Sequence, residues 1–168
     1  MNSTAYTRKP WFRGRVAVPT NAEGKEIAST FGDHANAADL VYSTPRDYAA
    51  FMIDVASDRH LATSVAYERD RSQVSMKNIA CKGAKAASCP PLVGFGLGWQ
   101  ILGFADATLM MHTGKDDGVF TFAYIDRSDQ SGAVIFTNSE NGCRIVLPLL
   151  ERLHARPAFL RFLRGQIE

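Results

Sequence analysis

The sequence predicts an α+β domain in which an antiparallel β-sheet of about four strands is flanked by helices. Residues 119–126 alternate along their length with apolar side chains on both faces, which is typical of a strand covered on both sides. Short connections join it to the strands expected at 108–112 and 133–137, so the three are antiparallel. Amphipathic helical patterns precede and follow this region, at 44–56 and from Asn141 onward.

We therefore expect one domain over residues 1–168. Loops and helices occupy 1–92, antiparallel strands occupy 93–138, and the C-terminal helices occupy 139–168. The net charge of +2 leaves no broad basic face, so nucleic acid is not an expected partner. No apolar run approaches the roughly 20 residues that span a bilayer. The first residues lack the apolar segment of a secretory signal, which taken alone indicates the cytoplasm.

The clearest helix signal lies at 44–56. Thr44 is a suitable N-cap, Pro45 suits the first helical position, and Asp47 stands where a capping-box acid belongs. An apolar stripe with helical spacing follows, formed by Tyr48, Phe51, Met52 and Val55. Upstream, residues 1–36 show no sustained period, and only a short strand is expected there, at 15–18.

Between this helix and the strands the signals are weaker. A second helix is expected within 58–70, with Leu61, Val65 and Tyr67 partly buried, and 71–92 is expected to be a loop. From Val93 the pattern becomes strand-like, with alternate apolar residues on one face: Phe95, Leu97, Trp99 and Ile101.

A polar triplet, His112-Thr113-Gly114, ends the strand at 108–112, and a turn is expected over 114–118. A second polar turn is expected at 127–131. The helix after Asn141 carries an apolar stripe, interrupted by Pro148, of Ile145, Val146, Leu149, Leu150 and Leu153. A last short helix is expected from Pro157 to Gly165.

The chain contains three cysteines. Cys81 and Cys89 bracket a small loop, so they can form a disulfide in an oxidising compartment; the alternative is two free thiols. Neither belongs to a C-x-x-C pair and the four histidines are scattered, so no metal site and no cofactor are expected.

Three separated segments together resemble the C-terminal half of the serine β-lactamase and penicillin-binding (DD-peptidase) superfamily, in its class C-like, esterase-containing branch. Residues 37–52, AADLVYSTPRDYAAFM, are similar to that family's "GLYSTARDLARF" helix start, and FGLGWQ at 95–100 is similar to its YGLGW strand. The triplet at 112–114, with FTNSENG at 136–142, is similar to its H/K-T-G turn and final strand. The first residues, MNST, look like its "LGM-x-x-T".

The resemblance implies serine hydrolysis of a β-lactam, a peptidoglycan peptide or a small ester. In such a site the backbone N–H of Lys115 is one oxyanion donor, and Thr113 bonds a substrate carboxylate or carbonyl. His112 stands where lysine is more usual and orients the site or adds a pH-dependent charge. Gly114 leaves room for substrate. Trp99 is expected in the core or cleft wall, and Asn138 borders the cleft or ends its strand.

The chain departs from the family pattern upstream of these segments. No serine is followed by lysine three residues on, since Ser75-Met76-Lys77 has the wrong spacing, and no Tyr-x-Asn element is present. Asp39 replaces the glycine usual before the LYST-like segment. Ser131 or Cys143 as a substitute nucleophile with His112 has no support from spacing. The nucleophile half is therefore expected to be absent and the isolated chain inactive.

A periplasmic or secreted parent protein is implied by the resemblance and would fit a disulfide. The rival hypothesis is a non-catalytic binding or dimerisation module. Without the upstream strands, residues 133–137 would form an open sheet edge, which would recruit a second copy or a complementing N-terminal half.

Overall fold

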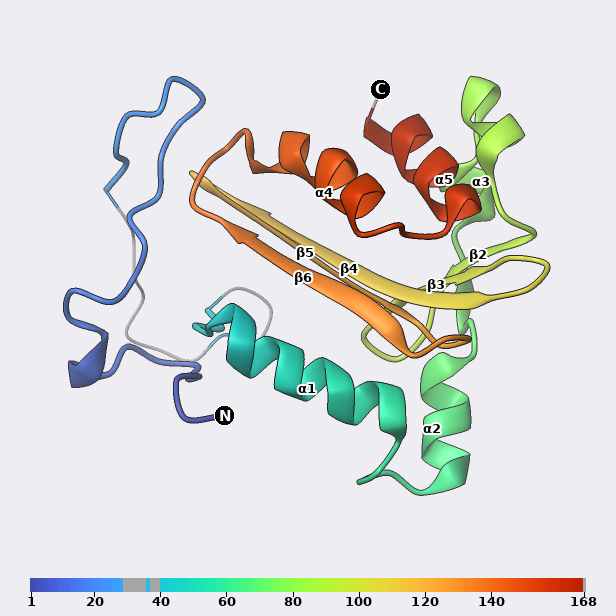
Figure 1. Cartoon of the computed structure of the whole chain (residues 1–168), viewed down its shortest axis with the longest axis horizontal. Helices are drawn as coiled ribbons and strands as arrows, with labels where there is room; N and C mark the ends of the chain where they lie inside the picture. Colours follow the sequence, from blue (N-terminus) through green and yellow to red (C-terminus); the bar gives the residue numbers. More distant parts are fainter. Residues whose placement is uncertain (29–35, 37–39, 168) are drawn as a thin grey trace.

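The computed structural model describes residues 1–28, 36 and 40–167. It contains a six-stranded antiparallel sheet in which the strands follow one another in chain order. Two helices cover one face of the sheet and a third crosses the other (Figure 1). The strands are β1 Val74–Ser75, β2 Leu92–Phe95, β3 Gln100–Gly103, β4 Thr108–Asp116, β5 Val119–Asp126 and β6 Ser131–Thr137.

The helical layers are made of short segments. One face carries α4 Val146–Arg152 and α5 Pro157–Ile167, and the other carries α1 Pro45–Ser57, with α2 Thr63–Asp70 beyond its end (Figure 1). The remaining helical elements are η1 Pro10–Phe12, α3 Lys77–Ala80, η2 Gly83–Ser88 and η3 Gly142–Ile145. The α+β class and the antiparallel pairing predicted from the sequence are confirmed.

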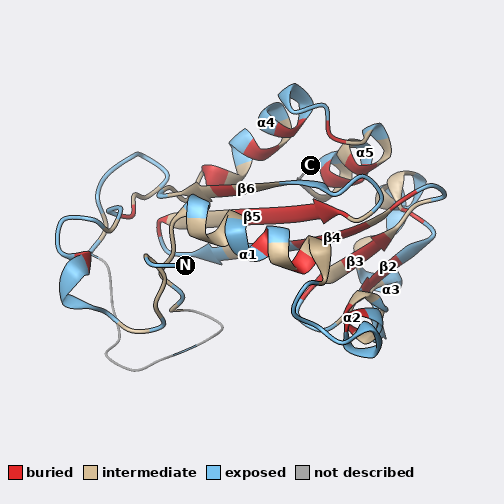
Figure 2. Ribbon diagram, turned by 60° about the horizontal axis from the view of Figure 1, so that its bottom comes forward, coloured by how far each residue is buried: buried red, intermediate tan, exposed pale blue. Residues whose placement is uncertain are grey.

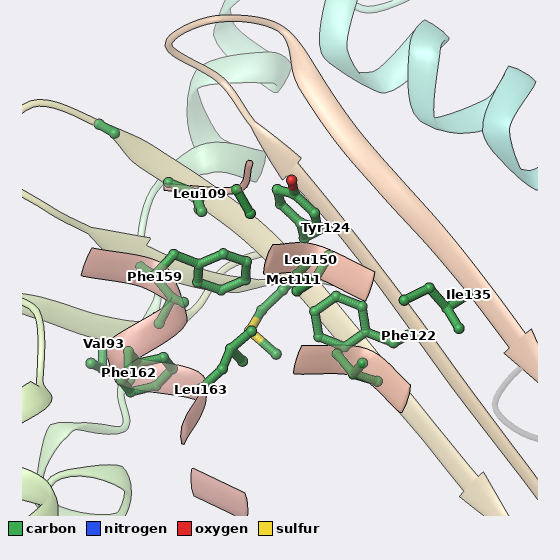
Figure 3. Close-up of a cluster of buried hydrophobic side chains, with 14 residues drawn as sticks. Val93, Leu109, Met111, Phe122, Tyr124, Ile135, Leu150, Phe159, Phe162 and Leu163 are labelled. Carbon is green, nitrogen blue, oxygen red and sulfur yellow. The ribbon is translucent and has the colours of Figure 1, made fainter. Parts of the chain in front are cut away.

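β5 is the most buried strand, and its two faces belong to two separate cores (Figure 2). Phe122 and Tyr124 pack beneath α4 and α5, where the larger core includes Leu150, Phe159 and other side chains shown in Figure 3. Ala123 and Ile125 face α1. The alternation predicted for 119–126 is therefore confirmed, with each face covered by helices.

α1 begins as the sequence predicts, because the Thr44 hydroxyl accepts a hydrogen bond from the Asp47 backbone N–H at 3.2 Å. Asp47 itself does not complete a capping box. Its carboxylate accepts hydrogen bonds from the Ser3 backbone N–H at 2.7 Å and the Thr4 hydroxyl at 3.0 Å. The carboxylate of Asp47 therefore ties the N-terminal segment to α1. Its pKa is lowered, and the largest cause is the hydrogen bond from the Ser3 backbone N–H. Asp39 lies outside the described residues.

Three sequence predictions in this part of the chain were wrong. Residues 15–18 are turn and irregular backbone rather than a strand. The helix expected within 58–70 is present as α2, Thr63–Asp70, but its buried residues differ from those predicted. In α2 the buried side chains are Ala66 and Arg69, whereas those predicted to be partly buried are exposed: Leu61, Val65 and Tyr67. The predicted loop at 71–92 contains β1, α3 and η2, which are too short to give a periodic signal.

The pattern predicted as one strand from Val93 is a hairpin of β2 and β3, which raises the strand count above four. Gly98 has a φ of +83° and lies in the turn, a conformation that glycine adopts easily. The apolar alternation continued across this turn and concealed it. At the C-terminus, α5 continues to Ile167, beyond the end expected at Gly165.

The helix after Asn141 begins as the 3-10 turn η3, and the regular helix α4 starts only two residues before Pro148. Of its predicted stripe, only Val146 and Leu150 are buried. The other three residues are exposed: Ile145, Leu149 and Leu153.

Candidate functional site

The polar triplet lies within β4 and not at its end. β4 pairs with β3 only as far as Met111, opposite Gln100, while its pairing with β5 continues to Asp116, opposite Val119. The edge of β4 over residues 112–116 is therefore unpaired on the β3 side, within the described part of the chain. Exposed backbone groups along such an edge are available to bind an extended ligand.

Strand alternation places the side chains of His112 and Thr113 on opposite faces of the sheet. Met110 belongs to the core beneath α1, and Met111 belongs to the core beneath α4 and α5. The side chain of His112 therefore lies on the face covered by α1, and that of Thr113 lies on the face covered by α4 and α5. Both residues are exposed. The two residues share the open strand edge rather than one side-chain cluster.

His112 is held by two local contacts. Its Nδ1 lies 2.9 Å from the Thr113 carbonyl oxygen, so the tautomer with a proton on Nδ1 donates to that carbonyl. Its ring meets the Phe95 ring edge-on, with centroids 6.5 Å apart. In the neutral ring, Nε2 is then the acceptor. Phe95 belongs to the FGLGWQ segment, but its contact with His112 was not predicted from the sequence.

Gly114 is constrained by its own sheet. A Cβ at this position would lie 2.5 Å from the Thr121 hydroxyl oxygen, in the next strand. Lys115 and Asp116 follow as exposed residues of β4 rather than as part of a turn. The turn is tighter than expected and contains Asp117 and Gly118, whose φ is +70°.

Two other residues singled out from the sequence have contacts of their own. Trp99 is buried in the core beneath α1, where it stacks on Phe51 at 6.3 Å between ring centroids. Asn138 is exposed, and its side-chain amide donates to the Val18 carbonyl oxygen at 2.8 Å. Its own carbonyl accepts from the Thr20 N–H at 3.0 Å, so this residue holds the N-terminal segment against the end of β6.

Cys81 and Cys89 are joined by a disulfide with Cα atoms 5.8 Å apart. The loop that they close includes η2 and packs against α5, and the side-chain amide of Gln166 donates to the Ala80 carbonyl oxygen at 3.0 Å. The disulfide therefore supports the face of the sheet opposite α1. Within the described residues, no three His, Cys, Asp or Glu side chains form a group suited to a metal ion.

An ionic cluster fixes the end of α1 over the sheet. Arg127 donates to the Val55 carbonyl oxygen at 3.1 Å and to the Asp58 carboxylate at 2.6 Å. The buried Arg69 donates to the same carboxylate at 2.6 Å. Burial acts to raise the pKa of Asp58, but the hydrogen bonds and charges of the two arginines outweigh it and lower the pKa. Arg127 was predicted only as part of a polar turn.

Comparison with known proteins gives a family and a fold. A family model described as Beta-lactamase matches residues 1–156. No curated protein matches the chain.

Solved structures share the fold at low identity. The octameric penicillin-binding protein homologue from Pyrococcus abyssi superposes with a TM-score of 0.67 at 16% identity, over 94% of this chain and 35% of its own. The D-amino acid amidase from Ochrobactrum anthropi SV3, complexed with D-phenylalanine, gives 0.63 at 20% identity, over 93% and 50%. The β-lactamase/D-alanine carboxypeptidase from Pseudomonas syringae gives 0.63 at 18% identity, over 93% and 50%. The chain thus spans between about a third and a half of the length of these proteins.

Proposed function

Because the chain belongs to the β-lactamase family, we propose that it supplies the His112-Thr113-Gly114 side of a serine hydrolase site whose nucleophile comes from another polypeptide segment. The observation that carries this proposal is the open edge of β4 over 112–116, where His112 and Thr113 are exposed beside an unpaired backbone. In support, no serine of this chain is followed by lysine three residues on.

The reaction proposed is acyl transfer from an amide or ester. A serine oxygen bonds to the carbonyl carbon, its proton passes to a base on the complementing segment, and the bond to the leaving nitrogen or oxygen breaks as that atom takes up a proton. The Lys115 backbone N–H stabilises the carbonyl oxygen as negative charge develops on it. The Thr113 hydroxyl bonds a substrate carboxylate or carbonyl, and the neutral ring of His112 accepts a hydrogen bond at Nε2.

The substrate class remains that of the family: a β-lactam, a peptidoglycan peptide or a small ester. Two of the structural neighbours are named for amide-cleaving activities, a D-amino acid amidase and a β-lactamase/D-alanine carboxypeptidase. These names favour an amide over an ester. We place the parent protein in the periplasm or outside the cell, because a disulfide such as Cys81–Cys89 persists in oxidising compartments. Among the described residues, no helix is both long and apolar enough to cross a membrane.

The test is complementation. The DNA upstream of the coding sequence is expected to encode, in frame or as a neighbouring gene, a segment with a Ser-x-x-Lys. Co-expression of that segment with this chain is expected to yield hydrolysis of a chromogenic β-lactam or an amino acid anilide. Absence of the coding segment, or an inactive reconstituted pair, would contradict the proposal.

Substitutions in the reconstituted pair test the residues named. Thr113→Val and His112→Ala are each expected to lower kcat/KM by about ten-fold or more. Lys115→Ala is the matched control, because it keeps the backbone N–H, and it should change kcat/KM by less than about two-fold. Full activity of both the Thr113 and His112 variants would show that the open edge of β4 is not the site.

A second candidate function is a binding or dimerisation module that uses the edge at 133–137. One specific observation favours it: β6 is the last strand of the sheet and pairs only with β5 among the described residues. The partner would be a second copy of the chain or the complementing half.

A further inference from the structure

We infer that Phe95 is a positioning residue for His112: its ring holds the imidazole in the orientation that keeps Nε2 as a hydrogen-bond acceptor at the open edge of β4. The inference rests on the proposed function and deepens it, because it names a further residue of the same site. The contact itself joins two described residues of this chain.

Phe95 and His112 meet just beyond the start of β3. Phe95 ends β2 and His112 lies on β4, with β3 between these two strands in the sheet. β3 begins only at Gln100, which pairs with Met111, so no residue of β3 pairs with His112. Backbones two strands apart are about 10 Å from each other. The two ring centroids are 6.5 Å apart, so the side chains lean toward each other past the first residue of β3.

The backbone of Phe95 is held from both sides. Its partners in the sheet are Val74 of β1 and Gln100 of β3. Its carbonyl oxygen accepts a hydrogen bond from the Gln73 backbone N–H at 2.7 Å. The ring therefore extends from a fixed point of the sheet.

The residue after Phe95 packs against the end of α2. A Cβ at Gly96 would lie 2.4 Å from the Arg69 carbonyl oxygen, which leaves room for glycine alone. The Leu97 backbone N–H donates to the same carbonyl oxygen at 3.4 Å. Arg69 is buried and hydrogen-bonded to Asp58, so the ionic cluster at the end of α1 also fixes the chain beside Phe95.

His112 depends more on its contacts than Phe95 does. Its side chain is exposed, and an exposed strand residue can occupy several χ1 rotamers. The hydrogen bond between its Nδ1 and the Thr113 carbonyl oxygen forms in the observed rotamer. The Phe95 ring meets the imidazole edge-on in that same rotamer, an arrangement that stabilises aromatic pairs beyond the area they bury. Phe95 therefore favours the state in which Nδ1 carries the proton and Nε2 is the acceptor.

The consequence concerns the reaction rather than folding. In the proposed acyl transfer, Nε2 of His112 accepts a hydrogen bond, so the direction of this acceptor has to be constant. A ring that turned between rotamers would present Nε2 correctly for only part of the time. Phe95 acts through His112 and needs no contact of its own with the substrate.

Nuclear magnetic resonance of the whole chain tests the contact directly. Long-range proton–nitrogen spectra of the His112 ring report which nitrogen carries the proton, and the Nδ1–H tautomer is expected at about pH 8, where histidine side chains are neutral. Phe95→Leu keeps an apolar side chain but removes the ring, and is expected to give a mixture of the two tautomers. Phe95→Tyr keeps the ring and should retain the wild-type tautomer. Unchanged His112 signals in Phe95→Leu would overturn the inference.

The matched control is Phe51→Leu. It makes the same change in a phenylalanine of α1 with nearly the same exposure, 39% against 37% for Phe95. Phe51 stacks on Trp99, so its replacement should leave the tautomer of His112 unchanged. A mixture of tautomers in this control as well would show that general loosening of the α1 side controls His112, and would overturn the inference.

Kinetics of the reconstituted pair separate this inference from the function that it deepens. Phe95→Leu is expected to lower kcat by about two-fold to ten-fold with little change in KM, and Phe95→Tyr should restore kcat. An inactive pair would contradict the proposed function, whereas the tautomer in the whole chain would decide whether Phe95 orients His112. An active pair in which Phe95→Leu has full kcat would overturn the role of Phe95 alone.

Discussion

The two faces of the sheet differ in how completely they are covered. Among the described residues, the core beneath α4 and α5 contains fourteen buried residues, whereas the core beneath α1 contains seven. β4 passes through both, with Met110 in the smaller core and Met111 in the larger, and leaves them at His112. The larger core is therefore expected to supply most of the stability, whereas the proposed site is open because the pairing of β3 with β4 ends at Met111.

The largest expected effect is in the core beneath α4 and α5. Phe159 is fully buried there, so Phe159→Ala should lower the free energy of unfolding by about 3–5 kcal/mol in urea titrations. Phe51→Ala, on the α1 side at a residue that is 39% exposed, should cost less than about 1.5 kcal/mol. Equal costs would mean that the two faces contribute equally.

The disulfide should come next, because the loop it closes packs against α5. Replacing both Cys81 and Cys89 by serine is expected to lower the free energy of unfolding by about 2–3 kcal/mol. Reducing agent should have the same effect on the wild-type chain and none on this variant. Cys143→Ser, at the free cysteine, serves as the control. A wild-type chain insensitive to reductant would argue that the disulfide does not stabilise this face.

On the α1 side, Asp58→Asn should cost about 1 kcal/mol, since the carboxylate bonded to Arg69 and Arg127 is partly exposed. The pKa of Asp58 is lower in the folded than in the unfolded chain, where it is near 3.8. Its stabilisation is therefore complete above that pH and is lost as the pH falls through the folded-state pKa. Urea titrations at decreasing pH should show a shallower loss of stability for the variant than for the wild type.

The smallest expected effect on stability is at the site itself. His112→Ala should change the free energy of unfolding by less than about 0.5 kcal/mol, because the side chain is exposed. Met110→Ala, two residues earlier on the same face and fully buried, should cost about 2–5 kcal/mol. A large cost at His112 would assign this residue to the fold rather than to a site.

Sequence patterns predicted the elements that depend only on residues close together in the chain. The cap at Thr44 and the alternation of 119–126 are two examples. The hairpin of β2 and β3 was missed because its apolar alternation runs through the turn at Gly98, and only the pairing of the strands reveals the turn.

The stripe after Asn141 was predicted as buried on one face, but η3 and the sheet beneath α4 leave room only for Val146 and Leu150. The triplet was singled out from its polar residues and from their resemblance to the family's H/K-T-G turn, and its role stays a prediction. Its setting was not predicted, because the unpaired edge of β4 depends on where β3 ends, and that end is fixed by the hairpin. Arg127 was missed for a similar reason, since its partners lie about 70 residues away in α1.

The most direct test of the central claim is the intact mass of the purified chain after incubation with a penicillin and, separately, with an activated ester. If the chain carries only one side of the site, its mass will not change and neither compound will be turned over. A stoichiometric acyl adduct would contradict this account, and the modified residue would identify the nucleophile within the chain.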